Sequence, residues 1–176
     1  MLALIACPFA AFAVWAGIAF AAQPEGGALS VERGKGVVML DLRGSILGRL
    51  SSGSLRVTDL TPADRWAALV AGRKVTQERV GPRTVVYRGQ GLRFRMLGGG
   101  YRVVVRGSGI DLSAVGKGVA VLDGEPRFAG DDVGVYSLDG VDCGVEPEPC
   151  LPLPLEPERF VLSAPIEGRF AGRATP

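Results

Sequence analysis

Short strand-like runs alternate with glycine breaks over residues 84–123, and this stretch constrains the fold more than any other part of the chain. The runs are five or six residues long, and the three-residue breaks between them read GQG, GGG, GSG and GKG. Residues 85–104 align on residues 103–122 without a gap, at a spacing of about 18. Self-similarity at a fixed spacing is typical of repeated supersecondary units.

Apolar residues alternate with polar or charged residues inside these runs. Leu92, Phe94 and Met96 alternate with Arg93 and Arg95. The same alternation recurs in the run Tyr101, Val103 and Val105, where Arg102 lies within the run and Arg106 follows it. It recurs again at Ile110, Leu112 and Ala114. A side-chain period of two places each apolar set on one face of a strand. Glycine reaches the positive φ that tight turns need, so we interpret the breaks as hairpin turns.

The pattern predicts an all-β fold, with an antiparallel β-meander punctuated by glycines and closed as a barrel or folded as a sandwich. A β-solenoid with a period of about 18 residues is the alternative. The solenoid would stack Arg88 directly on Arg106, which is unfavourable for like charges. The meander would place these two arginines two strands apart.

One short helix is expected over residues 62–71. Thr61 suits an N-cap, Pro62 suits the first helical position and Gly72 suits the end of the helix. Trp66 lies within this segment and is expected to cap an open end of the barrel or sandwich.

Residues 1–22 contain no charged side chain, which indicates export. They are either a signal peptide that ends at the small-residue site of residues 19–21 or an N-terminal membrane anchor. Residues 23–27 form a linker. In both interpretations the folded part is extracytoplasmic, secreted or in the cell envelope, and it contacts a membrane only through residues 2–22 if they are not cleaved.

The remaining chain divides into a repetitive β-domain (28–138), an acidic Pro-rich strap (139–158), a final strand (159–165) and a loose tail (166–176). The strap carries six acidic residues and no Lys or Arg. Cys143 and Cys150 lie within it and are expected to form a disulfide in an oxidising compartment. We expect the strap to lie across an arginine-bearing sheet face made by Arg93, Arg95, Arg102 and Arg106.

The chain lacks the residues on which most catalytic sites depend. It contains no His, which excludes Ser-His-Asp and Cys-His nucleophiles and most zinc sites. No Walker loop is present, and no cofactor or metal is expected. A hydrolase using paired carboxylates is a further alternative, with Asp111, Asp123 and Asp139 as its candidates.

The stretch GIDLSAVGKG (109–118) and the closing pattern YSLDG…C…C (136–150) resemble a group of small exported β-rich proteins of high-GC Gram-positive bacteria. The resemblance implies an exported β-fold. That group has no assigned activity, so the resemblance implies no functional residues.

These observations favour a non-catalytic structural or interaction module of the cell envelope. The alternative is a domain that binds an anionic envelope polymer through Arg93, Arg95, Arg102 and Arg106. The expected partner is an envelope protein or such a polymer. Nucleic acid is not expected, because aromatic residues are sparse on the arginine face.

Overall fold

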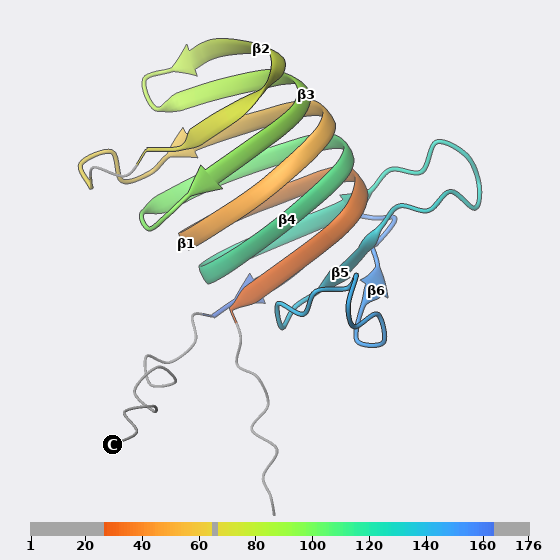
Figure 1. Cartoon of the computed structure of the whole chain (residues 1–176). Coiled ribbons are helices and arrows are strands. Elements are labelled where there is room, and N and C mark those ends of the chain that lie inside the picture. Colours follow the sequence, from red (N-terminus) through yellow and green to blue (C-terminus); the bar gives the residue numbers. More distant parts are fainter. Residues whose placement is uncertain (1–26, 65–66, 164–176) are drawn as a thin grey trace, which may run out of the picture.

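The computed structural model describes residues 27–64 and 67–163, which fold as a single antiparallel sheet (Figure 1). The strands are β1 (Ala28–Asp59), β2 (Leu69–Gly81), β3 (Thr84–Met96), β4 (Gly100–Gly124), β5 (Val135–Ser137), β6 (Leu151–Pro152) and β7 (Glu158–Leu162). Their order is β2-β3-β1-β4-β7, with β5 paired to β1 and β6 paired to β5. The all-β prediction is confirmed, and the sheet is not closed into a barrel.

The two long strands, β1 and β4, wind around each other as an antiparallel coil. Val115 of β4 pairs with Ala28 on one side and, one circuit further along β1, with Ser45 on the other. Val37 of β1 likewise pairs with both Arg106 and Asp123, which are one circuit apart on β4. Each strand therefore returns beside its own earlier residues, separated from them by a single segment of the other strand. Because adjacent strands lie about 4.8 Å apart, one turn advances the coil by about 10 Å.

A row of glycines marks one of the two edges where the coil bends; the paired Gly44 and Gly116 lie at the other. We call the row the glycine corner; in spatial order it consists of Gly89, Gly53, Gly107, Gly36 and Gly124, each in register with the next. A Cβ on Gly107 would lie 2.0 Å from the Ser52 carbonyl oxygen, and a Cβ on Gly53 would lie 2.1 Å from the Arg106 carbonyl oxygen. Both glycines have positive φ, 148° and 141°. Only residues without a side chain fit this close approach of two backbones.

The prediction that the glycine breaks are hairpin turns is therefore wrong for three of the four. GQG (89–91) lies within β3, and GSG (107–109) and GKG (116–118) lie within β4. Only GGG (98–100) is at a strand connection, between β3 and β4. The glycines bend a continuous strand instead of ending it.

The bends fold the sheet into two layers that enclose the core, as the doubled-back ribbons of Figure 1 show. The first layer comprises residues 28–35, 45–52, 69–73, 90–96 and 108–115; the second comprises residues 37–43, 54–59, 76–81, 84–88, 100–106, 117–123 and 158–162. Leu29, Ile46, Leu92, Met96 and Ala114 of the first layer are fully buried, as are Leu55, Val103, Val105, Ala120 and Leu122 of the second.

The observed winding combines features of both predicted architectures. Its period, the step from Ala28 to Ser45 along β1, is close to that of the solenoid alternative, although adjacent segments run antiparallel. Ser54 pairs with Arg88 on one side and with Arg106 on the other, so the two arginines are two strands apart. The like-charge stack that a parallel coil would create is thus absent at these positions.

The helix expected over residues 62–71 is not found in the described part of that range. Thr61 does not act as an N-cap: its hydroxyl donates to Asp64 and accepts from the backbone N–H of Gly100, and the chain makes only a turn there. Residues 69–71 then belong to β2, where Leu69 pairs with Arg95. Pairing with β3 satisfies the backbone of this segment and overrides its local helical pattern. Trp66 lies outside the described residues.

The C-terminal segments close the end of the coil opposite β2. Residues 125–134 form a loop, and the final strand is β7, at 158–162 rather than 159–165. The two described ends of the chain lie together, because a Cβ on Gly27 would lie 1.8 Å from the Ser163 carbonyl oxygen. The predicted signal or anchor (1–22) and the tail (166–176) lie outside the described residues.

Candidate anion-binding surface

The four arginines predicted to share one sheet face lie on two different layers. Arg93 and Arg95 point away from the core of the first layer, because Leu92, Phe94 and Met96 between and beside them are buried. Arg102 and Arg106 point outward from the second layer by the same alternation. The prediction of a single arginine face is therefore wrong, because the four arginines lie on two different outer faces.

The two predicted arginines of the second layer, Arg102 and Arg106, are matched by carboxylates, although Arg43 and Arg56 on the same layer form no ion pair within the described residues. Arg102 donates through Nη2 and Nε to Oδ2 of Asp41, at 2.6 and 3.0 Å, and Asp41 is its partner across β1 and β4. Nη2 of Arg106 lies 3.5 Å from Oε1 of Glu125. These pairs are exposed, so each adds little stability, but they neutralise Arg102 and Arg106 locally.

The first layer keeps an excess of positive charge. Arg93 lies opposite Arg49 on β1 and Ala71 on β2. Arg49 donates through Nε to Oδ2 of Asp111 at 2.7 Å, and this hydrogen bond raises the pKa of Arg49. Among the described residues, neither Arg93 nor Arg95 forms an ion pair. Three guanidinium groups therefore face solvent here with one carboxylate among them.

A hollow of about 440 Å³ brings a fourth arginine into this group. Its lining includes Arg49, Arg73 and Arg93, together with Gly72 and Gly91, which leave the backbone open. Arg73 forms no ion pair within the described ranges. We call Arg49, Arg73, Arg93 and Arg95 the arginine patch. A wider groove of about 800 Å³ shares Arg49 and Arg93 and continues across the first layer as far as Asp142.

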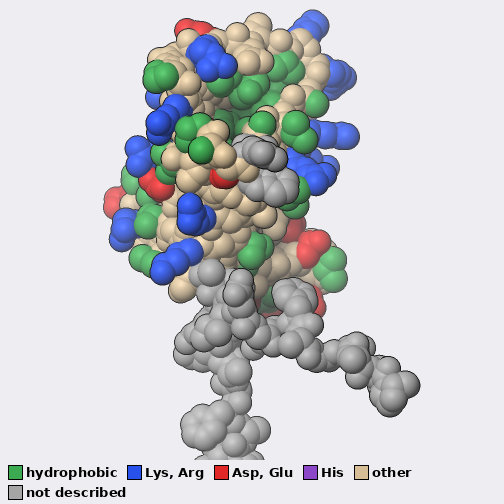
Figure 2. All heavy atoms as spheres, turned by 90° about the vertical axis from the view of Figure 1, so that its left-hand side faces the viewer, with side chains coloured by type: hydrophobic (Ala, Val, Ile, Leu, Met, Phe, Trp, Pro, Cys, Tyr) green, Lys and Arg blue, Asp and Glu red, His purple; other side chains and the backbone are tan. Residues whose placement is uncertain are grey.

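The charge distribution differs between the two flanks of the molecule in the space-filling view (Figure 2). On the right-hand flank Lys and Arg side chains follow one another, and Asp and Glu gather only near its lower end. On the left-hand flank acidic and basic side chains are interspersed. Guanidinium groups in excess over carboxylates favour the binding of an extended anion.

The acidic strap was expected to lie across the four predicted arginines, but it does not cover them. It packs at the β7 end of the coil, where β6 pairs with β5 and Gly124 donates its backbone N–H to the Pro154 carbonyl at 2.6 Å. Gly144 donates to Glu32 at 3.1 Å. No ion pair joins a strap carboxylate of the described chain to any of the four predicted arginines.

The disulfide prediction is confirmed. Cys143 and Cys150 are bonded, with their Cα atoms 5.9 Å apart, and they close the strap into a small loop. A structural disulfide of this kind is typical of an oxidising compartment outside the cytoplasm. The part of the chain that the structure describes contains no helix suited to crossing a bilayer.

The candidate carboxylates for hydrolysis are not brought together. Asp111 bonds Arg49 on the outside of the first layer, and Asp123 pairs with Val37 in the second. Asp139, after β5, accepts a hydrogen bond from the Ser137 hydroxyl, which is the main cause of its lowered pKa. Within the described ranges these acids share no hydrogen bond and no cavity, and no cluster of acidic or sulfur ligands could hold a metal.

Comparison of the chain with protein-family models, with curated proteins and with solved structures finds no match. The arginine patch therefore rests on its geometry. Arg93 and Arg95 were predicted from their alternation with apolar residues, whereas Arg49 and Arg73 were not predicted. Their place in the patch depends on pairing across β1, β2 and β3, for which local spacing gives no signal.

Proposed function

We propose that this protein is a non-catalytic module of the cell envelope that binds an anionic polymer through the arginine patch. The observation that supports the proposal is the contrast between the arginine patch and the pair Arg102 and Arg106. Arg102 and Arg106 are matched by Asp41 and Glu125, whereas the patch holds four arginines with a single carboxylate partner, that of Arg49.

The physical argument concerns the spacing of charge along a surface. Arg93 and Arg49 are cross-strand neighbours, and Arg73 lines the same hollow, so their mutual repulsion is relieved when an anion lies between them. Guanidinium groups bind phosphate, sulfate and carboxylate groups in a bidentate manner. Leu47 and Leu69, which flank Arg95 on neighbouring strands, are 46% and 64% exposed and offer apolar contact to the backbone of a polymer.

The test is retention of the intact, detergent-solubilised chain on immobilised heparin, used as a model polyanion, with elution by a salt gradient. Arg93→Gln with Arg95→Gln should elute at clearly lower salt than the wild type. The matched control, Arg102→Gln with Arg106→Gln, removes the same charge from the second layer and should elute close to the wild type.

The two variants separate a specific surface from general positive charge. Equal losses of retention would show that net charge alone determines binding, and an unretained wild type would overturn the proposal. Retention should fall steeply with ionic strength because exposed charges are screened over about 8 Å at physiological salt. Circular dichroism of both variants controls for folding.

A further inference from the structure

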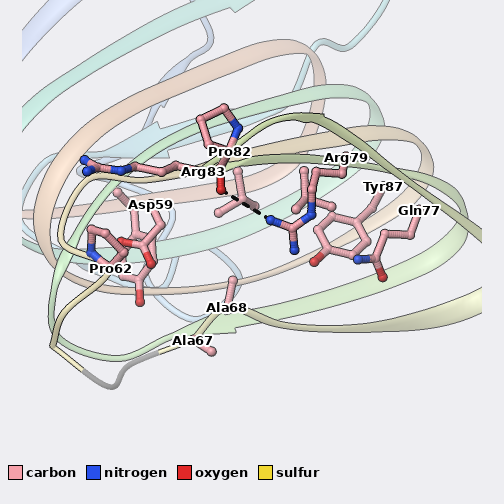
Figure 3. Close-up of a pocket in the computed structure, with 12 residues that line it drawn as sticks. Asp59, Pro62, Ala67, Ala68, Gln77, Arg79, Pro82, Arg83 and Tyr87 are labelled. Carbon is pink, nitrogen blue, oxygen red and sulfur yellow. Dashed lines mark hydrogen bonds between the residues drawn. The ribbon is translucent and has the colours of Figure 1, made fainter.

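A cavity of about 330 Å³ opens at the β2 end of the coil and shares no residue with the arginine patch. It lies where β1 ends, where β2 turns into β3 and where β4 begins (Figure 3). Its lining consists of Val57, Asp59, Pro62, Ala67, Ala68, Gln77, Arg79, Pro82, Arg83, Val85, Tyr87 and Tyr101. We call it the end cavity.

The inner wall of the end cavity is apolar and belongs to the core. Val57 and Tyr101 are 5% and 1% exposed, and Tyr87 packs against the same core as a partly buried residue. Val85 lies opposite Val57 on the neighbouring strand, so both side chains point to the inside of the second layer. The cavity is thus an opening toward the space between the layers, and the partly buried side chains of Ala68, Val85 and Tyr87 supply the apolar surface that a ligand can reach.

The rim carries two cations and one carboxylate. Arg79 donates through Nη1 to the Pro82 carbonyl at 3.3 Å, which leaves its other N–H groups available, and neither Arg79 nor Arg83 forms an ion pair within the described residues. Asp59 accepts a hydrogen bond from the Thr61 backbone N–H at 2.9 Å. Figure 3 shows Arg79 and Tyr87 on one side of the cavity and Asp59 on the other.

We propose that the end cavity binds a small amphiphilic monoanion, such as a hydrocarbon carboxylate, with its apolar body on the inner wall and its head group on Arg79; Arg83, whose side chain extends toward the Asp59 side in Figure 3, adds positive charge to the rim. Pockets that hold small ligands are mostly apolar, contain a few charged or polar groups that fix orientation, and begin at about 300 Å³. The apolar wall selects for hydrocarbon, and the excess of guanidinium over carboxylate selects for a single negative charge. A polymer-binding module would then carry a second, independent ligand site at the opposite end of the coil from its described termini.

The experiment uses the intact chain and dodecanoate below its micellar concentration as the probe. Saturable, one-to-one binding is measured by isothermal titration calorimetry. Arg79→Gln with Arg83→Gln should weaken binding about tenfold or more, since charge-assisted hydrogen bonds are lost. The matched control is Arg102→Gln with Arg106→Gln, which should bind like the wild type.

A second variant tests the apolar wall independently of charge. Val85→Trp fills the cavity and should abolish binding even though both arginines remain. Dodecanol, which has the same chain without the charge, should bind at least tenfold more weakly than dodecanoate. Absence of saturable binding, an equal affinity of the Arg79/Arg83 variant and the control, or equal binding of dodecanol would each overturn the proposal. Heparin retention of the Arg79/Arg83 variant reports separately on the arginine patch.

Discussion

Replacing Gly107 with alanine tests whether the glycine corner holds the coil together. The added Cβ would lie 2.0 Å from the Ser52 carbonyl oxygen and 2.9 Å from the Cα of Gly53. Both neighbours are backbone atoms in a paired strand, so neither can move without separating β1 from β4. The φ of 148° adds a conformational cost, because residues with a side chain rarely adopt it.

The expected loss of stability follows from these two contributions. A residue held in an unfavourable φ region costs about 1–3 kcal/mol. Moving the strands apart weakens the neighbouring backbone hydrogen bonds, each worth about 1 kcal/mol net. We therefore expect Gly107→Ala to lower the free energy of unfolding by about 3–5 kcal/mol, a large part of the roughly 5–15 kcal/mol typical of a domain.

Two other glycines separate the contributions. Gly130 has a φ of 84° but nothing within 4 Å of its added Cβ, so Gly130→Ala should cost only about 1–2 kcal/mol. Gly81 has its nearest contact at 3.8 Å and no positive φ, so Gly81→Ala should change stability by less than about 1 kcal/mol. Urea unfolding of the intact chain, followed by far-UV circular dichroism, measures all three. A cost at Gly107 no larger than that at Gly130 would refute the close-approach argument.

Two further predictions concern the C-terminal segments. Cys143→Ser with Cys150→Ser should lower the free energy of unfolding by about 2–3 kcal/mol, because loss of the crosslink raises the entropy of the unfolded chain. An unchanged urea midpoint under oxidising conditions would contradict this expectation. The hydrogen bond from Lys35 is the main cause of the lowered pKa of Asp131, whose ordinary value is 3.8. The ionised carboxylate therefore stabilises the fold above pH 3.8, and this stabilisation is lost as the pH falls through the lowered pKa. Asp131→Asn should flatten the pH dependence of the urea midpoint in this acidic window, and an unchanged slope would count against the bond.

Local alternation predicted the faces of the strands well. Leu92, Phe94 and Met96 are all buried, as expected, because a side-chain period of two depends only on residues near one another in sequence. The role of the glycines was not predictable in the same way. Gly107 bends a strand because it meets Gly53, which belongs to a different strand far away in the sequence, and spacing within a single run does not reveal that partner.

The same distinction explains the errors in the candidate site. Arg93 and Arg102 have similar sequence surroundings, yet only Arg102 has an aspartate, Asp41, as its cross-strand neighbour. Whether an arginine is neutralised therefore depends on the strand pairing, which sequence patterns did not establish. Residues 69–71 show the same effect, since a segment with helical end signals becomes strand once β3 offers it a partner.

The fixed period of the winding limits how a protein of this kind can change its length. One inserted residue in β1 would displace every later glycine from the corner, whereas a full circuit, equal to the step from Ala28 to Ser45, added to both β1 and β4 would complete another turn. Each such step lengthens the coil by about 10 Å and leaves both ends unchanged. The architecture is therefore suited to act as a spacer whose length changes only in whole turns. We expect related proteins to differ in length by whole turns.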